Sequence, residues 1–219
     1  MSARILAIDT TGEFGSLALV EEGTLAGQVQ LHSPDGFAHI LFEAIDRLLQ
    51  AASWRAGQID CFATAAGPGA FTGVRVGMAA AKGLAEACGK PVVAVSNLQA
   101  IAAFGSRPLR AAFFDARRGE IYGSVYNAAL EPVAPEVVSK FPEWLASLPS
   151  CDIEVLTPNL APFRESLAGA TATEVPRALA GAIGQIAAAR FAAGLALDAA
   201  AIDANYVRRS DAELLWKDR

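Results

Sequence analysis

Short apolar runs separated by turn residues predict that the chain opens with three strands. The polar turn Asp9-Thr10-Thr11-Gly12 divides the first run from the second, and Glu21-Glu22-Gly23 divides the second from the third. Such closely spaced runs are typical of an antiparallel meander. The predicted strands cover 4–8, 16–20 and 24–31.

The apolar positions change to helical spacing after the meander. From Gly36 to Ala52 they recur every three or four residues, which predicts an amphipathic helix with His39 near its start. The next predicted elements are a strand over 59–65, a helix over 72–88 capped by Thr72 and ended by Gly89, a strand over 91–95 and a helix over 97–104. Three strands followed by such crossovers describe a mixed sheet of the ribonuclease-H-like kind.

The stretch 65–77 looks like a phosphate loop but lacks the residues of one. A Walker A loop needs a lysine six positions after its first glycine, where this chain has Gly73 or Arg75. The dinucleotide pattern fails at Thr72, and Gly69 stands where a nucleophile elbow needs serine. The pattern therefore predicts none of these three chemistries.

The helix over 72–88 carries internal glycines, each of which costs about 1 kcal/mol relative to alanine. Gly73, Gly77, Ala80 and Leu84 follow three- and four-residue spacing, so they form one smooth stripe. Two interpretations remain open. Either another part of the same molecule packs against the stripe, or the stripe belongs to an interface with a partner protein.

The opening pattern returns in the second half of the chain. An apolar strand ending at Asp115, a turn and a strand over 120–126 repeat the form of the first hairpin, whose first strand ends at Asp9. We therefore predict an α/β fold of two ribonuclease-H-like lobes, 1–105 and 106–219, of the actin, hexokinase and Hsp70 class. The second lobe is expected to be degenerate, because its prolines limit helices and strands. A final helix is predicted over 176–193.

Composition and charge exclude several classes of protein. Of the 219 residues 53% are hydrophobic, and the net charge is −5, so the chain has a substantial core but no electrostatic footprint for nucleic acid. Its three cysteines lack metal-site spacing, which fits a reducing compartment. Neither a secretory apolar region nor a run of transmembrane length is found, so we expect a cytoplasmic protein without membrane association.

Motifs that run from end to end of the chain resemble those of one family. They are Ile5 to Thr11, His39, Gly67 to Gly77, Lys82 to Ala85, Asp115 to Tyr122, and Tyr206 to Arg208. In this order they resemble the TsaB (YeaZ) family. The glycine segment and the hairpin Asp-Ala-Arg-Arg-Gly-Glu are highly specific together, although Ala70 departs from the serine usual in the family.

The resemblance implies a non-catalytic subunit that binds and supports its paralogue TsaD in threonylcarbamoyladenosine (t6A) modification of tRNA position 37. The ATPase TsaE completes the assembly, tRNA is involved indirectly through the complex, and a homodimer is possible without TsaD. Pairing is implied through the helices over 36–52 and 72–88. We assign to this partner interface His39, Gly73, Arg75, Gly77, Ala80 and Leu84.

The histidines agree with a chain that is not itself an enzyme. TsaD binds its metal with two histidines spaced by three residues on a helix, whereas His32 and His39 have six residues between them. We expect His32 in a loop and His39 on a helix face, and we expect neither a metal site nor a cofactor.

A remnant of a nucleotide pocket is expected at Asp9, Thr10, Thr11 and Asp115. The two carboxylates either hold Mg²⁺ across a cleft, as in phosphotransferases, or each caps its own turn, which is the plainer interpretation. The alternative function is therefore an ATP-dependent phosphotransferase of the actin and hexokinase class. A peptidase ranks last, because no grouping of serine, histidine and acid can be argued from position.

Overall fold

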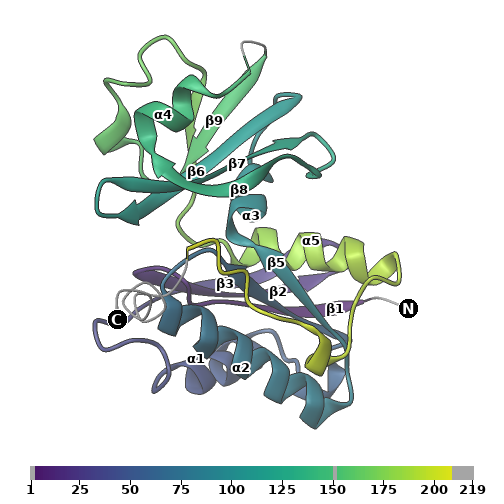
Figure 1. Ribbon diagram of the computed structural model, residues 1–219. Helices are drawn as coiled ribbons and strands as arrows, with labels where there is room; N and C mark the ends of the chain where they lie inside the picture. Colours follow the sequence, from purple (N-terminus) through teal and green to yellow (C-terminus); the bar gives the residue numbers. More distant parts are fainter. Residues whose placement is uncertain (1–2, 150–151, 209–219) are drawn as a thin grey trace, which may run out of the picture. The chain divides into compact units, whose positions relative to one another are not determined.

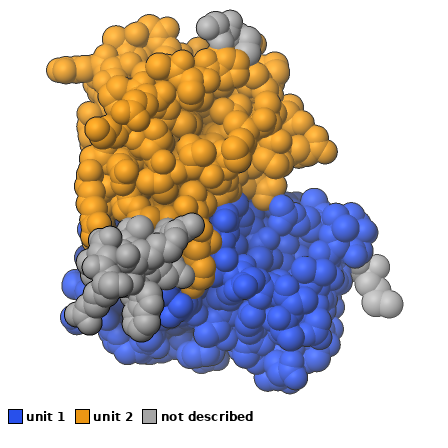
Figure 2. All heavy atoms as spheres, in the orientation of Figure 1, with its two compact units in different colours: residues 1–97, 178–205 blue, residues 98–177, 206–219 orange. Residues whose placement is uncertain are grey.

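The computed structural model describes residues 3–149 and 152–208 of the chain. Within this part the chain forms two compact units (Figures 1 and 2). Of the described residues, unit 1 comprises 3–97 and 178–205, and unit 2 comprises 98–149, 152–177 and 206–208. This division differs from the split expected after residue 105, because the chain after 177 returns to the first unit.

Unit 1 contains a mixed five-stranded sheet. Its strands are β1 (Arg4–Asp9), β2 (Phe14–Glu21), β3 (Thr24–His32), β4 (Cys61–Gly67) and β5 (Val92–Ser96). Their spatial order is β3-β2-β1-β4-β5, with β1 antiparallel to β2, β2 antiparallel to β3, and β4 and β5 parallel to β1. The predicted meander and crossovers are confirmed. β1, β2 and β4 are buried on both faces, which explains why their sequences are nearly continuous apolar runs.

Helices cover both faces of this sheet (Figure 1). α1 (Leu41–Ala51) and α2 (Phe71–Cys88) lie on one face, and α5 (Ala180–Ala192) lies on the other. The inward sides of α1 and α2 form one core with the sheet, in which Leu41, Ile45 and Met78 pack with Phe62. Both helices are amphipathic, so burying their apolar sides stabilises the unit and leaves their outer sides exposed.

Contacts of α5 explain why the segment 178–205 belongs to unit 1. The backbone N–H of Ala180 donates to Ser16 Oγ at 3.0 Å, and that of Gly181 donates to Gln28 Oε1 at 2.9 Å. Gly184 lies so close to β2 that an added Cβ would be 2.7 Å from a Val20 methyl carbon. The predicted helix over 176–193 therefore exists, but it packs on the first sheet.

α1 begins later than the sequence predicts. Residues 37–40 form a turn in which the Ile40 N–H donates to the Phe37 carbonyl at 3.1 Å. The helix begins at Leu41, so the exposed His39 precedes it instead of lying on its face.

α2 begins slightly earlier than predicted and has a different N-cap. Ala70 is the N-cap residue and has extended backbone, so Thr72 lies within the first turn and does not cap the helix. The C-terminus agrees with the prediction, because Gly89 ends the helix with a left-handed φ of 62°.

Unit 2 repeats the sheet of unit 1 strand for strand. Its strands are β6 (Leu109–Arg117), β7 (Glu120–Asn127), β8 (Pro132–Lys140), β9 (Ile153–Thr157) and β10 (Ala172–Glu174). The order β10-β9-β6-β7-β8 matches that of unit 1 when β6 takes the place of β1. The predicted echo of the first hairpin is confirmed, and it extends to the three further strands that the sequence pattern did not predict.

The helices of unit 2 are much shorter than those of unit 1. They are α3 (Asn97–Ala102) and α4 (Phe141–Ala146), and this unit also has a 3₁₀ turn at Ala161–Phe163. In the described part of unit 1, 3₁₀ turns lie at Ala56–Gln58 and Ala199–Ala201. Pro132 and Pro135 lie in β8, which is an edge strand and tolerates a missing N–H. Pro142 lies in the first turn of α4, and Pro162 lies in a 3₁₀ turn, so prolines accompany the short elements.

An aromatic cluster forms the core of unit 2 where unit 1 has long helices. The fully buried Phe113 ring has its centroid 5.0 Å from Phe141, 5.4 Å from Trp144 and 4.9 Å from Phe163. Aromatic side chains bury large areas from few residues, so short elements can still close this core. Across residues 3–149 and 152–208, the structure has no helix with the length and apolar character needed to cross a membrane.

Candidate functional site

The glycine segment of unit 1 wraps around the first turn of the chain. The Thr10 hydroxyl donates to the Gly73 carbonyl at 2.7 Å, and the Ala70 N–H donates to the Thr11 carbonyl at 2.8 Å. A Cβ added at Gly73 would lie 2.0 Å from the Thr10 carbonyl oxygen, and one added at Gly77 would lie 2.5 Å from Thr10 Oγ1. The absence of side chains at Gly73 and Gly77 therefore allows this turn to pack against α2. This contact corresponds to the first interpretation of the stripe, in which another part of the same molecule packs against it.

Gly67 and Gly69 also need to be glycine, for reasons inside the same unit. Gly67 has a φ of 98°, a left-handed conformation that side chains rarely adopt, and an added Cβ would be 2.9 Å from the Asn205 carbonyl oxygen. At Gly69 an added Cβ would be 2.7 Å from the Thr11 Cβ. Close approach of the chain to itself thus accounts for the motif.

Asp9 closes a buried hydrogen-bond network behind this turn. Its Oδ1 accepts from the Thr11 N–H at 3.0 Å and from the Thr11 hydroxyl at 2.6 Å. Asn97 Nδ2 donates to Thr11 Oγ1 at 2.7 Å, and Asn97 Oδ1 accepts from the Gly67 N–H at 3.1 Å. The network joins the carboxyl ends of β1, β4 and β5. Asn97 was not predicted, although an Asn directly after the strand β5 is the signal that could have indicated it.

Burial dominates the electrostatics of Asp9. The residue is 2% exposed, and loss of hydration raises the pKa of its carboxyl above the ordinary value of 3.8, although hydrogen bonds from Thr11 and Asn97 act in the opposite direction. The carboxylate faces hydroxyl and amide donors of its own unit. This arrangement matches a residue that caps its own turn.

Asp115 occupies the corresponding position of unit 2 in a different environment. It lies near the end of β6, is exposed, and accepts from the Arg117 N–H at 2.8 Å. Arg117, Arg118 and Gly119 all have left-handed φ, so the turn between β6 and β7 is tight. Each aspartate accepts hydrogen bonds from its own turn, and the two belong to different units.

The motif Tyr206 to Arg208 contributes to the same hairpin of unit 2. Arg208 Nη1 donates to the Ala116 carbonyl at 2.8 Å, and Nη2 forms an ion pair with Glu120. The guanidinium also lies 5.8 Å from the centroid of the Tyr122 ring. The two separate motifs of the family pattern therefore meet in one structural cluster.

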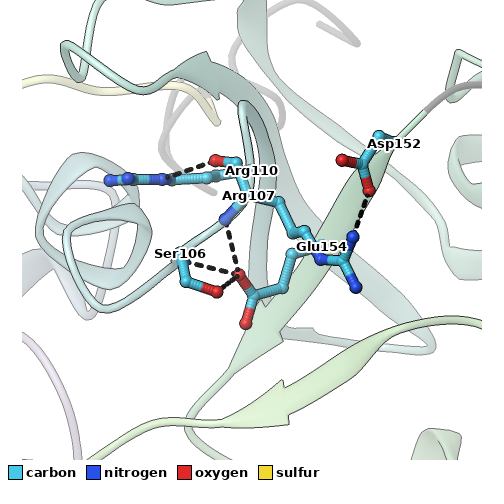
Figure 3. Close-up of polar contacts among 5 residues, drawn as sticks. All are labelled: Ser106, Arg107, Arg110, Asp152 and Glu154. Atoms are coloured by element: carbon cyan, nitrogen blue, oxygen red, sulfur yellow. Dashed lines mark hydrogen bonds and ion pairs between the residues drawn. The ribbon is translucent and has the colours of Figure 1, made fainter.

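A second buried carboxylate, Glu154, holds the connection that leads into β6 (Figure 3). Its Oε2 accepts from the N–H groups of Ser106 at 2.7 Å and Arg107 at 3.2 Å, and its Oε1 accepts from the Thr173 hydroxyl at 2.6 Å. Burial alone would raise the pKa of Glu154, but these hydrogen bonds outweigh it and lower the pKa below the ordinary value of 4.5.

Arginines extend this cluster on the same connection. Arg110 Nε donates to the Arg107 carbonyl at 3.1 Å and its Nη1 donates to the Ala102 carbonyl at 3.3 Å, while Arg107 pairs with Asp152 at 2.7 Å. Figure 3 shows Arg107 reaching Asp152 beside Glu154. The cluster holds the backbone of this connection within unit 2.

The outer sides of α1 and α2 present a surface of a different kind. Phe42 on α1 is 58% exposed, and Phe71 on α2 is 41% exposed with the Arg75 guanidinium 3.7 Å from its ring centroid. Ala79 and Gly83 are exposed on α2, and an added Cβ at Gly83 would meet nothing within 4 Å. We call Phe42, Phe71, Arg75, Ala79 and Gly83 the outer face. Its small residues were not predicted, although they recur at the same helical spacing as the inward stripe.

The structure separates the residues assigned to a partner interface into two groups. Gly77 and Ala80 are buried, and Gly73 lies against Thr10, so this part of the stripe faces the unit's interior. Arg75 is exposed on the outer face, and Leu84 is half-buried at the margin of the core. His39 is exposed in the turn before α1.

The histidines do not come together as a metal site. His32 lies at the end of β3 instead of in a loop, and its ring stacks on Phe14 at a centroid distance of 4.9 Å. Over the described ranges, no group of three or more histidine, cysteine or acidic side chains has the geometry to hold a metal ion.

Two sheets of corresponding strand order, one in each unit and each accompanied by helices, define an α/β protein of the actin, hexokinase and Hsp70 class. A family model described as TsaD, tRNA N6-adenosine threonylcarbamoyltransferase, matches residues 33–205. The chain belongs to the TsaB (YeaZ) family.

Individual relatives agree with this placement. The chain is 34% identical over 157 residues to the tRNA threonylcarbamoyladenosine biosynthesis protein TsaB of Bacillus subtilis, which covers 69% of each chain. It is 36% identical over 128 residues to the Escherichia coli protein of that name, covering 57% of this chain and about half, 55%, of the relative. The solved structure of YeaZ from Pseudomonas aeruginosa superposes with a TM-score of 0.78 at 28% identity, covering 93% of this chain and 99% of the other.

Proposed function

We propose that this chain is a non-catalytic subunit in the biosynthesis of t6A in tRNA, and that it binds and supports a TsaD-type transferase. The observation that carries the proposal is the contrast between the two sides of α2. Thr10 of the same chain occupies the space beside the inward glycines, whereas the outward side of the helix exposes small and aromatic residues. The names of the relatives supply the pathway.

The outer face has the composition of a surface that another helix can cover. Ala79 and Gly83 allow the backbone of a partner helix to approach closely, and Phe42 and Phe71 supply apolar area. Arg75 stacks on Phe71 and offers a charge at the rim. We therefore place the partner interface on the outer face, with His39 and Leu84 at its margins.

Two features support a non-catalytic role. Thr10 and Thr11 pack against the segment that resembles a phosphate loop. They leave no space for a phosphate beside Gly73 and Gly77. The histidines lie on separate elements, whereas TsaD-type metal binding uses a helical pair. In this proposal TsaD performs the transfer, TsaE completes the assembly in the cytoplasm, and the tRNA contacts this chain only through the complex.

The test replaces a small residue of the outer face by a large charged one. Ala79→Arg is expected to weaken binding to the purified TsaD-type partner at least tenfold, because burying an unpaired charge and separating the helices each cost more than about 1.4 kcal/mol. Ala192→Arg is the matched control, since Ala192 is exposed on α5 at the opposite face of the sheet. Affinity is measured by calorimetric titration and t6A formation by reconstitution with TsaD and TsaE.

Wild-type affinity in a folded Ala79→Arg variant would place the interface elsewhere. Formation of t6A by this chain alone, given threonylcarbamoyl-adenylate and tRNA, would refute the non-catalytic role. Micromolar binding of Mg-ATP that disappears in Asp9→Asn would favour the phosphotransferase alternative instead. A homodimer that dissociates when the TsaD-type partner is added would show that both partners use the same face.

A further inference from the structure

We propose that Thr10 is a positioning residue that sets the register of α2 against the sheet and thereby holds the outer face in its binding geometry. The inference rests on the proposed function, because the outer face is the surface offered to the TsaD-type partner. Thr10 is 1% exposed and contacts α2 at Gly73 and Gly77, on the inward side of the helix. Its effect on the partner is therefore transmitted through α2.

Two contacts of Thr10 define where α2 can lie. Its hydroxyl donates to the carbonyl of Gly73 at 2.7 Å, inside the first turns of the helix. Its carbonyl oxygen and its Oγ1 take the space where side chains at Gly73 and Gly77 would begin. A sideways or lengthwise shift of α2 would break the hydrogen bond or drive the helix backbone into Thr10. Thr10 and the two glycines thus form one complementary packing contact between the turn and α2.

Hydrogen bonds from several neighbouring segments fix the position of the turn that carries Thr10. The carboxylate of Asp9 accepts from the N–H and the hydroxyl of Thr11, and Asn97 bridges Thr11 to the Gly67 N–H. The Thr11 carbonyl in turn accepts from the Ala70 N–H, which is the N-cap residue of α2. A buried network in which the members satisfy one another specifies a single position for its backbone.

The same helix carries the outer face on its opposite side. Arg75 follows Gly73 by two positions, and Ala79 follows Gly77 by two positions, so in each pair the second residue lies on the far side of the helix. Interfaces between closely packed helices depend on shape complementarity, so displacing α2 displaces the whole face. The hydroxyl at position 10 is therefore expected to matter for partner affinity.

The experiment compares Thr10→Val with Thr10→Ser in the full-length chain. Valine keeps the branched shape but puts a methyl group where Oγ1 lies 2.7 Å from a carbonyl oxygen, whereas serine keeps the hydroxyl. Thr24→Val is the control, because Thr24 is exposed on the edge strand β3. Affinity for the TsaD-type partner is titrated well below the melting temperature, and hydrogen exchange is followed in the first two turns of α2.

We expect Thr10→Val to lower the affinity for the TsaD-type partner about tenfold or more and to speed amide exchange in the first two turns of α2. Thr10→Ser is expected to keep both the affinity and the exchange rate near those of the wild type, and Thr24→Val is expected to change neither. Wild-type affinity in a folded Thr10→Val protein overturns the inference, and so does a Thr10→Ser variant that fails to restore binding. If the wild-type chain does not bind the partner, the proposed function fails by itself. Unchanged exchange in α2 then overturns the positioning role as well, whereas faster exchange supports it.

Discussion

The two units share one strand order and differ in what surrounds it. In unit 1 the sheet lies between helices of 11, 18 and 13 residues, whereas unit 2 has helices of 6 residues and a cluster of aromatic rings. Helices α1 and α2 carry the outer face, so the surface that we propose for a partner lies on the unit with the long helices.

The hairpins of the two units repeat the contrast at the level of one residue. Asp9 is 2% exposed and joins three strand ends, whereas Asp115 is exposed and accepts from a single backbone N–H. In unit 2 the buried carboxylate is Glu154 instead, and it holds a connection. Equivalent places in the topology therefore carry different chemistry, and the donors around each carboxylate decide its behaviour.

The largest effect is expected in the aromatic core of unit 2. Phe113→Ala should lower the free energy of unfolding of that unit by about 3–5 kcal/mol, because it removes a fully buried ring and leaves a cavity. Hydrogen exchange resolved by residue should show β6, β7 and β9 losing protection more than β1 and β4. The control is Phe104→Ala, since Phe104 is 39% exposed. Equal loss of protection in both sheets would contradict the division into separate units.

Two glycines of α2 should respond in opposite directions to the same substitution. Gly73→Ala should cost about 1–3 kcal/mol or more, because the new Cβ would overlap the Thr10 carbonyl oxygen. Gly83→Ala should instead stabilise the protein by up to about 1 kcal/mol, since that position is open and alanine favours helix. Thermal and urea unfolding measure both. A stabilising Gly73→Ala would show that the contact between Thr10 and α2 leaves space for a side chain at position 73.

Glu154 is expected to make unit 2 sensitive to acid. Its folded pKa is lowered, so its contribution to stability is present above the ordinary value of 4.5 and is lost as the pH falls through the folded value. Glu154→Gln weakens charge-assisted hydrogen bonds to Ser106 and Arg107, which should cost about 1–2 kcal/mol at pH 7 and less at low pH. Denaturation over a pH series measures the slope. Glu165→Gln at an exposed position of unit 2 is the control, and an unchanged slope in Glu154→Gln would contradict the assignment.

Asp9 should have the smaller effect and the opposite sign. Its folded pKa is raised above 3.8, so the folded state binds the proton more readily and stability falls as the pH rises from 3.8 through the folded value. Asp9→Asn should remove this slope while changing stability at pH 7 by no more than about 1 kcal/mol, because the amide oxygen still accepts from Thr11. Asp115→Asn should leave stability within about 0.5 kcal/mol, as is usual for exposed sites. Equal pH profiles for the two variants would remove the distinction between the hairpins.

Much of the fold could be predicted because its signals are local. The apolar runs of β1 and β2, the period of α1 and the glycine that ends α2 depend on neighbours in the chain. The echo of the first hairpin around Asp115 also indicated a second sheet. The strands β8, β9 and β10 escaped prediction, since β8 is a half-exposed edge strand that contains two prolines, and β9 and β10 have only five and three residues.

The candidate site was harder to predict than the fold. Sequence spacing identified a stripe on α2 and left open which way it faced. Gly73 and Gly77 proved to face Thr10, and the exposed small residues are Ala79 and Gly83 on the other side. Both stripes have helical spacing, so periodicity alone cannot tell the inner side of a helix from the outer one when each carries small residues.

The sequence by itself determined the order of strands and helices up to β7, the repeat of the first hairpin and the motifs that indicate the family. Only the tertiary structure decided that α5 packs on the first sheet and that Asn97 links the turn of Asp9 and Thr11 to Gly67. It also decided that Thr10 occupies the space beside the glycines of α2. The physical reason is the range of the contacts. Secondary structure follows from neighbours along the chain, whereas these contacts join residues 30 to 164 positions apart and exist only once the sheet has brought them together.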